Sequence, residues 1–237
     1  MKLMKTVIII PSRWGSTRLP GKPLAMIGNK PMIQRVWEGA CESIADEVII
    51  ATDSKLVFDT ATEFGAQVIL TPDCETGTDR VIGVQQLKNA DFIINVQGDE
   101  PFINPEDINE VISIVHAHPD KVATIVAALT SDEGTDPNVV KAMCNDAGLI
   151  GMFTRSSIYT KTNFAFKHIG LYGYSASVLN KISLLEPTES SIKDSLEQLT
   201  WMDNNISIIA GWTSYESLGV DTEKDLEKAN ELLKTIS

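Results

Sequence analysis

The sequence is poor in cysteine and in aromatic residues. Its three cysteines, Cys41, Cys74 and Cys144, lie far apart and form no C-x-x-C pair, and aromatic residues make up 6% of the chain. Neither a disulfide framework nor a zinc site is therefore expected, and a reducing cytoplasm is the expected location.

Positive charge is scarce as well. The 20 Lys and Arg residues stand against 32 Asp and Glu residues, which gives a formal net charge of -12. Proteins that bind nucleic acids need basic surface to neutralise phosphates, so we expect no nucleic-acid partner. No secretory segment precedes the first expected strand and no apolar run has the length that crosses a bilayer, so we expect no membrane association.

What the sequence does contain is an alternation of apolar β-branched segments with helical segments. A length of 237 residues with 43% hydrophobic residues fits one domain spanning residues 1–237. The alternation favours an α/β fold with three layers, in which helices cover both faces of a mostly parallel sheet. The expected strands are residues 6–10, 47–52, 66–70, 92–97 and 122–128, and the helices begin near residues 31, 55, 79 and 105.

The pattern changes at Asn138. We expect a hairpin of strands 139–143 and 149–153 joined by a turn at 145–148. The expected elements after the hairpin are an irregular stretch over 154–167, a strand over 168–174 and a helix over 191–202. They end with a strand over 206–210 and a helix over 223–235 that is capped by Thr222. We interpret residues 138–190 as an inserted hairpin region that could serve as a dimerisation arm.

The loop over residues 11–23, directly after the first strand, gathers three cations in an acidic chain. Arg13, Arg18 and Lys22 stand beside Gly15 and Gly21, which allow close approach of the backbone. This composition indicates a site for a multiply charged anion, and a nucleoside triphosphate is the natural candidate. An ordinary solvated basic loop remains the alternative.

A P-loop does not fit this segment. Five residues rather than four separate Gly15 from Gly21, and Pro23 stands where a hydroxyl that binds magnesium belongs. Pro20 and Pro23 also disfavour a helix that begins at Lys22.

Polar residues follow several of the expected strands. Residues 13–22, Asp53, residues 76–80 and residues 97–100 all come after such strands. Because ligands of open α/β sheets bind beyond the carboxyl ends of the strands, we expect these segments to form one composite site.

Two aspartates of these segments are candidate magnesium ligands. Magnesium takes one or two carboxylates together with phosphate oxygens and water. Asp99 follows a buried strand and Asp221 precedes the last helix. Asp99 could instead satisfy backbone groups of a turn, Asp221 could support the start of the helix, and Asp79 could cap its own helix.

With these residues taken together, the chain resembles the 3-deoxy-manno-octulosonate (Kdo) cytidylyltransferases over almost its whole length. The segments that carry the resemblance are residues 11–24, 51–53, 76–80, 95–101, 168–174, 196–199 and 219–222. The resemblance implies a fold like that of the nucleotide-diphospho-sugar transferases, a homodimer and a magnesium cofactor. It implies transfer of a cytidylyl group from CTP to Kdo, giving CMP-Kdo and pyrophosphate for lipopolysaccharide biosynthesis.

The same resemblance implies roles for individual residues. Lys22, Arg13 and Asp99 would be catalytic, and Asp99 and Asp221 would hold magnesium. The nucleotide would be bound by Arg13, Ser16, Lys22, Gly77, Arg80 and Gln97. The acid sugar would be bound by Arg80, Gln97, Arg155, His168, Tyr172, Glu197 and Gln198. From the residues alone, His168 could equally be a packed histidine, and Glu197 and Gln198 could be surface residues.

Departures from the family pattern lie on the sugar side. Residues 159–161 replace a usual proline and aromatic, Thr200 replaces a usual arginine, and residues 190–193 differ as well. A variant acid such as 8-amino-3,8-dideoxy-manno-octulosonate, or another acid sugar of the sialic-acid type, is therefore an alternative substrate. An inactive nucleotide-binding regulatory module is the alternative from a different functional class.

Overall fold

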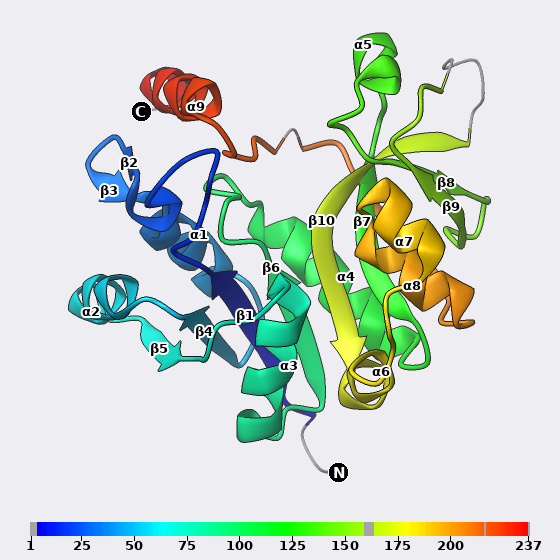
Figure 1. Ribbon diagram of the computed structural model, residues 1–237, viewed down its shortest axis with the longest axis horizontal. Coiled ribbons are helices and arrows are strands. Elements are labelled where there is room, and N and C mark those ends of the chain that lie inside the picture. Colours follow the sequence, from blue (N-terminus) through cyan, green and yellow to red (C-terminus); the bar gives the residue numbers. More distant parts are fainter. Residues whose placement is uncertain (1–3, 159–163, 216, 237) are drawn as a thin grey trace. The chain divides into compact units, whose positions relative to one another are not determined.

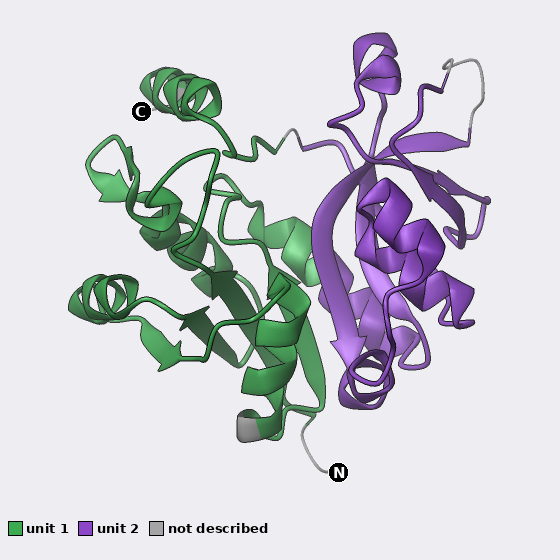
Figure 2. Cartoon of the chain, in the orientation of Figure 1, with its two compact units in different colours: residues 1–109, 217–237 green, residues 110–216 purple. Residues whose placement is uncertain are grey.

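The computed structural model describes residues 4–158, 164–215 and 217–236 (Figure 1). The chain divides into two compact units, one of residues 1–109 with 217–237 and one of residues 110–216 (Figure 2). The single domain expected from the sequence remains a prediction. None of the helices within the described ranges is long and apolar enough to span a bilayer.

The first unit is built on a parallel sheet with the strand order β6-β1-β4-β5. Its strands are β1 (Thr6–Ser12), β4 (Glu47–Thr52), β5 (Gln67–Leu70) and β6 (Phe92–Val96). Helices α1 (Met32–Cys41), α2 (Lys55–Glu63), α3 (Gly77–Lys88) and the start of α4 (Pro105–Ala117) accompany it. β1 is buried along residues 6–10 because it has strands on both sides and helices packed on the sheet. The predicted α/β class is confirmed.

The end of the chain returns to this first unit. Helix α9 (Glu223–Ile236) contacts the small hairpin of β2 (Met26–Ile27) and β3 (Lys30–Pro31). Val220 packs in one apolar cluster with Leu19 and Phe102, and its N–H donates to the carbonyl of Asp99 at 2.9 Å. The predicted cap at Thr222 is confirmed, since Thr222 Oγ1 accepts from the N–H of Asp225. Asp221 is thereby brought beside Asp99.

The second unit contains the predicted hairpin. Its strands are β7 (Val122–Ala127), β8 (Lys141–Cys144), β9 (Ile150–Thr154), β10 (Ala165–Ser175) and β11 (Ile208–Thr213). β7 lies between parallel β11 and antiparallel β10, and β10 also pairs with β8, which forms the hairpin with β9. Gly148 in the hairpin turn has φ 75°, and a Cβ there would lie 2.5 Å from the carbonyl oxygen of Ala210. The turn therefore requires glycine.

The helices of the second unit are the rest of α4, α5 (Ser131–Thr135), α6 (Ala176–Ile182), α7 (Glu189–Asp194) and α8 (Glu197–Asp203). The expectation of one helix over 191–202 is wrong, because Ser195 adopts a left-handed conformation with φ 52° and separates α7 from α8. The expected irregular stretch over 154–167 is also too long, since β10 begins at Ala165. Its residues 159–163 lie outside the described ranges.

Candidate active site

A pocket of about 300 Å³ lies in the first unit at the carboxyl ends of β1 and β6. Its walls come from residues 11–13 at the end of β1, residues 74–77 at the start of α3, and residues 97–99 after β6, together with Lys22 and Asp221. Three of the four segments that the sequence placed at one sheet edge contribute to this pocket, with Arg18 and Arg80 also in the wall. Asp53, the fourth, does not line the pocket and pairs with Arg80 instead.

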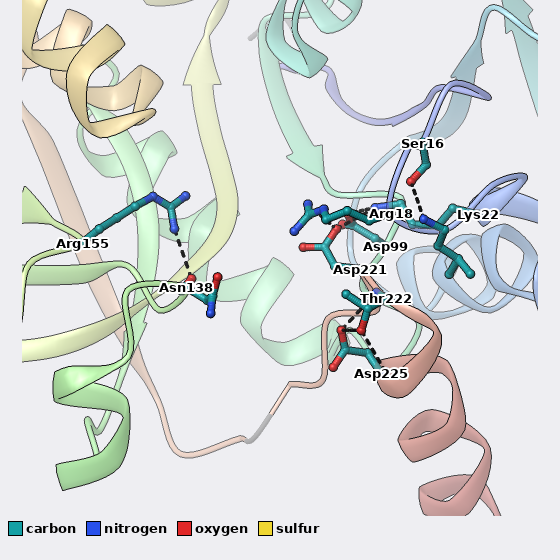
Figure 3. A network of polar contacts seen from close by, with 10 residues as sticks. Ser16, Arg18, Lys22, Asp99, Asn138, Arg155, Asp221, Thr222 and Asp225 are labelled. Carbon is teal, nitrogen blue, oxygen red and sulfur yellow. Dashed lines mark hydrogen bonds and ion pairs between the residues drawn. The ribbon is translucent and has the colours of Figure 1, made fainter.

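Lys22 pairs with both carboxylates of this pocket (Figure 3). Gly21 has φ 67°, and the chain then forms the short 3-10 helix η1 (Lys22–Leu24) instead of the α-helix that a P-loop requires. Lys22 Nζ donates to Asp99 Oδ2 at 2.6 Å and to Asp221 Oδ1 at 3.1 Å. Burial acts to lower the pKa of Lys22, but the two carboxylates raise it above its ordinary value. The lysine is therefore a fixed cation.

The two carboxylates have the chemistry of a magnesium site. Asp99 and Asp221 both reach the same lysine nitrogen, so their oxygens converge on one small volume. Nowhere in the described ranges do three or more His, Cys, Asp or Glu side chains form a metal-binding group. A pair of carboxylates fits magnesium, which fills its remaining positions with phosphate oxygens and water.

The other cations of the loop occupy different environments. Arg18 Nη2 donates to Asp221 Oδ1 at 2.9 Å, and both side chains are well exposed. Arg13 is exposed and lines the pocket. Ser16 contacts its own loop, where its Oγ accepts from the N–H of Leu19 at 3.3 Å. Arg18 is thus a candidate phosphate-binding residue that the assignment by resemblance left out, although its charge was visible in the loop.

Backbone close to the pocket is shaped by glycine and by a helix cap. A Cβ on Gly98 would lie 2.8 Å from the carbonyl oxygen of Pro11, so β1 and the loop after β6 can approach only without a side chain there. Gly77 is the first residue of α3, where the side chains of Thr76 and Asp79 form a capping box. The capping role considered for Asp79 is confirmed.

Arg80 and Gln97 line the pocket but bind protein groups. Arg80 is 2% exposed, and its Nη2 pairs with Asp53 Oδ2 at 2.7 Å. Its Nη1 also donates to Thr71 Oγ1 and to the carbonyl of Pro72. Gln97 Nε2 donates to Asn95 Oδ1 at 3.2 Å, which leaves the amide oxygen of Gln97 as an acceptor. Arg80 therefore fastens α3 to the end of β4.

In the second unit, His168 and Tyr172 belong to an aromatic cluster on β10. Their ring centroids are 5.3 Å apart, and Tyr172 meets Trp201 edge-on at 5.2 Å. Burial lowers the pKa of His168 to about 3, so the imidazole is neutral. The hydroxyl of Thr124 lies 2.8 Å from the carbonyl of Leu171 and donates to it, so His168 Nε2 donates to Thr124 Oγ1 at 3.0 Å. This assignment leaves His168 Nδ1 as an acceptor.

The remaining candidates for sugar binding are also in the second unit. Burial, with a contribution from the Glu197 carboxylate, raises the pKa of Tyr172. Glu197 and Gln198 are the first residues of α8, and Gln198 is 5% exposed. Gln198 is therefore not the surface residue that the sequence allowed.

Arg155 is held by backbone carbonyls (Figure 3). Its Nη1 donates to the carbonyl oxygens of Asn138 at 3.2 Å and Pro137 at 3.3 Å. The fully buried Lys141 fixes this segment, since its Nζ donates to three carbonyls, those of Asp136, Val139 and Arg155. No sequence signal marked Lys141 as buried, because it lies in an alternating strand pattern where a lysine is ordinarily exposed.

Comparison with known proteins gives a consistent result. A family model described as cytidylyltransferase matches residues 7–231. A protein of Thermodesulfovibrio yellowstonii is 38% identical over 255 residues, which cover 99% of this chain and 100% of that protein. One of Solibacter usitatus is 42% identical and covers 97% of this chain and 95% of its own. Both are named 3-deoxy-manno-octulosonate cytidylyltransferase.

A solved structure is also similar over nearly the whole chain. It is that of a CMP:2-keto-3-deoxy-manno-octonic acid synthetase complexed with CTP. It is 38% identical, has a TM-score of 0.93, and covers 98% of this chain and 100% of its own.

Proposed function

The chain belongs to the cytidylyltransferase family, and from this premise we propose that it transfers the cytidylyl group of CTP to the anomeric hydroxyl of 3-deoxy-D-manno-octulosonate (Kdo). The products are CMP-Kdo and pyrophosphate. The observation that carries the proposal is the pocket in which Lys22 lies between Asp99 and Asp221, in a chain whose full-length relatives carry the name of this enzyme. These charged groups are intact, which argues against the alternative of a regulatory module that has lost catalysis.

The reaction needs positive charge at the triphosphate. The sugar hydroxyl attacks the α-phosphorus, the bond to the β-phosphate oxygen breaks, and negative charge grows on the phosphate oxygens and on pyrophosphate. Lys22, Arg13 and Arg18 supply fixed cations that bind the phosphates and stabilise this charge. Asp99 and Asp221 would hold magnesium, which when bound neutralises phosphate charge and acidifies a coordinated hydroxyl.

The acid sugar requires a cation of its own and several neutral hydrogen-bonding groups. Arg155 is half-buried and has no carboxylate partner in the described ranges, so it is a better carboxylate ligand than Arg80, whose guanidinium is already paired with Asp53 and is 2% exposed. Neutral His168 offers an acceptor, and Tyr172, Glu197 and Gln198 are proposed to bind hydroxyls. A homodimer, a cytoplasmic location and a role in lipopolysaccharide biosynthesis belong to the same proposal.

A pyrophosphate-release panel tests this function. Purified protein with magnesium is given CTP, UTP or ATP together with Kdo, 8-amino-3,8-dideoxy-manno-octulosonate or a sialic acid. We expect release with CTP and Kdo, at a kcat/KM well above that of every other pair. A higher kcat/KM with the 8-amino acid would identify that acid, rather than Kdo, as the substrate. Binding of CTP without release of pyrophosphate in any pair would indicate a regulatory module.

A further inference from the structure

Ser12 has a buried hydroxyl without a hydrogen-bond partner among the described residues. It is the last residue of β1, it is 3% exposed, and it lies in the wall of the pocket. Its register partner on β4 shows the ordinary situation, since Thr52 Oγ1 accepts from the N–H of Ser54 at 3.2 Å. Buried hydroxyls are generally paired, because burial removes their hydrogen bonds to water. An unpaired hydroxyl on a residue that lines a pocket points to a ligand group.

The chemistry of the pocket indicates which part of the ligand Ser12 meets. Charged groups such as Lys22 and Arg18 match the phosphates. Ser12 is neutral and can both donate and accept, and Gln97 in the same wall has an amide oxygen that accepts no hydrogen bond from the described part of the chain. Neutral groups of this kind suit the edge of a base or a ribose hydroxyl, which carry no charge.

We propose that Ser12 Oγ hydrogen-bonds to the nucleoside part of the bound nucleotide, at the base edge or at a ribose hydroxyl, and so contributes to nucleotide specificity. The inference rests on the proposed function of the pocket as a CTP site. Ser12 completes its hydrogen bonding when the nucleotide binds, so the free protein gains nothing from its hydroxyl.

The test is Ser12→Ala with two readouts, nucleotide binding and thermal stability. We expect the calorimetric Kd and the KM for CTP to rise roughly three- to ten-fold, as for loss of one neutral hydrogen bond. We expect kcat to change less than KM, and the Tm of the free protein to stay constant or rise. The matched control is Ser175→Ala, because Ser175 Oγ donates to Pro119 O at 2.6 Å and accepts from Val178 N at 3.2 Å. That control should lower the Tm and leave CTP binding unchanged.

Three further ligands separate the possible sources of the contact. If Ser12→Ala loses much less affinity for UTP than for CTP, the contact is at the base. If it loses much less affinity for dCTP than for CTP, the contact is at the ribose 2′-hydroxyl. Both outcomes support the proposal. An equal loss for inorganic tripolyphosphate assigns Ser12 to the phosphates and overturns it. Unchanged CTP binding, or a fall in Tm like that of Ser175→Ala, also overturns it. Because binding is measured without sugar, failure of transfer in the wild type does not affect this test.

Discussion

Lys22 is the residue on which most of the proposed chemistry converges. Its ammonium is within 3.1 Å of two carboxylates, and its side chain is 17% exposed. We expect Lys22→Ala and Asp99→Ala each to lower kcat/KM by on the order of 100-fold or more, because the first removes a cation from the triphosphate site and the second removes a proposed magnesium ligand. Pyrophosphate release measures activity, and circular dichroism and melting check that the variants fold.

A surface lysine of the same unit provides the control for these variants. Lys30 pairs with Glu38, and the two side chains are 36% and 35% exposed. Lys30→Ala should therefore retain activity. Near-normal turnover of either Lys22→Ala or Asp99→Ala would remove that residue from the mechanism.

At the same scale, the sequence predicted which residues gather but not how they pair. Arg13, Arg18 and Lys22 were expected at one anion site, and all three line the pocket. The pairing of Arg18 with Asp221 was not predictable, since an irregular loop has no periodicity that fixes side-chain direction. The ion pair between Arg80 and Asp53 was not predicted for a related reason. The two residues meet only when α3 packs beside β4, which no local sequence pattern encodes.

Two capping boxes allow the role of α3 to be tested at the level of the element. Thr76 caps α3 and lines the pocket, whereas Thr130 caps α5 in the second unit. We expect Thr76→Ala and Thr130→Ala each to lower the free energy of unfolding by about 0.5–2 kcal/mol. Only Thr76→Ala should raise the KM for CTP, because it loosens the helix start at Gly77. Urea titration and initial rates measure the two effects, and an equal rise in KM for Thr130→Ala would refute this role of α3.

Elements of the first unit were predictable from local pattern, whereas those after Asn138 were less so. The runs of β-branched residues in β1, β4 and β6 need burial on both faces and read clearly as strands. The break between α7 and α8 has no glycine or proline to announce it. There the hydroxyl of Thr200 donates to Ser191 Oγ at 2.8 Å, a tertiary contact between the two helices that local propensity does not encode.

At the scale of the whole molecule, the lowered pKa of His168 makes the free energy of unfolding depend on pH. Its pKa is about 3 in the folded protein against an ordinary value of 6.5, so the unfolded chain binds the proton first as pH falls. Stability contributed by neutral His168 is complete above pH 6.5 and is lost as pH falls toward 3. Urea midpoints measured between about pH 4.5 and 7.5 should therefore fall less steeply for His168→Gln than for the wild type.

A second group titrates in a lower range and serves as the reference. Burial opposes ionisation of Glu47, but hydrogen bonds from Lys5 and Lys88 lower its pKa to about 2 from 4.5. Its contribution is present above pH 4.5 and is lost as pH falls toward 2. Glu47→Gln should thus leave the slope above pH 4.5 unchanged. Identical slopes for His168→Gln and the wild type over the upper range would show that His168 is protonated without cost.

The first unit is assembled from two stretches of sequence, residues 1–109 and 217–237, with all of residues 110–216 between them. During synthesis on the ribosome, Lys22 and Asp99 leave the exit tunnel long before Asp221 is translated. The pocket therefore lacks one of its carboxylates, and the cluster around Leu19 lacks Val220, until residues 220 and 221 have been added. Chains that stop before residue 220 lack both groups, so we expect them neither to complete the pocket nor to close the cluster around Leu19.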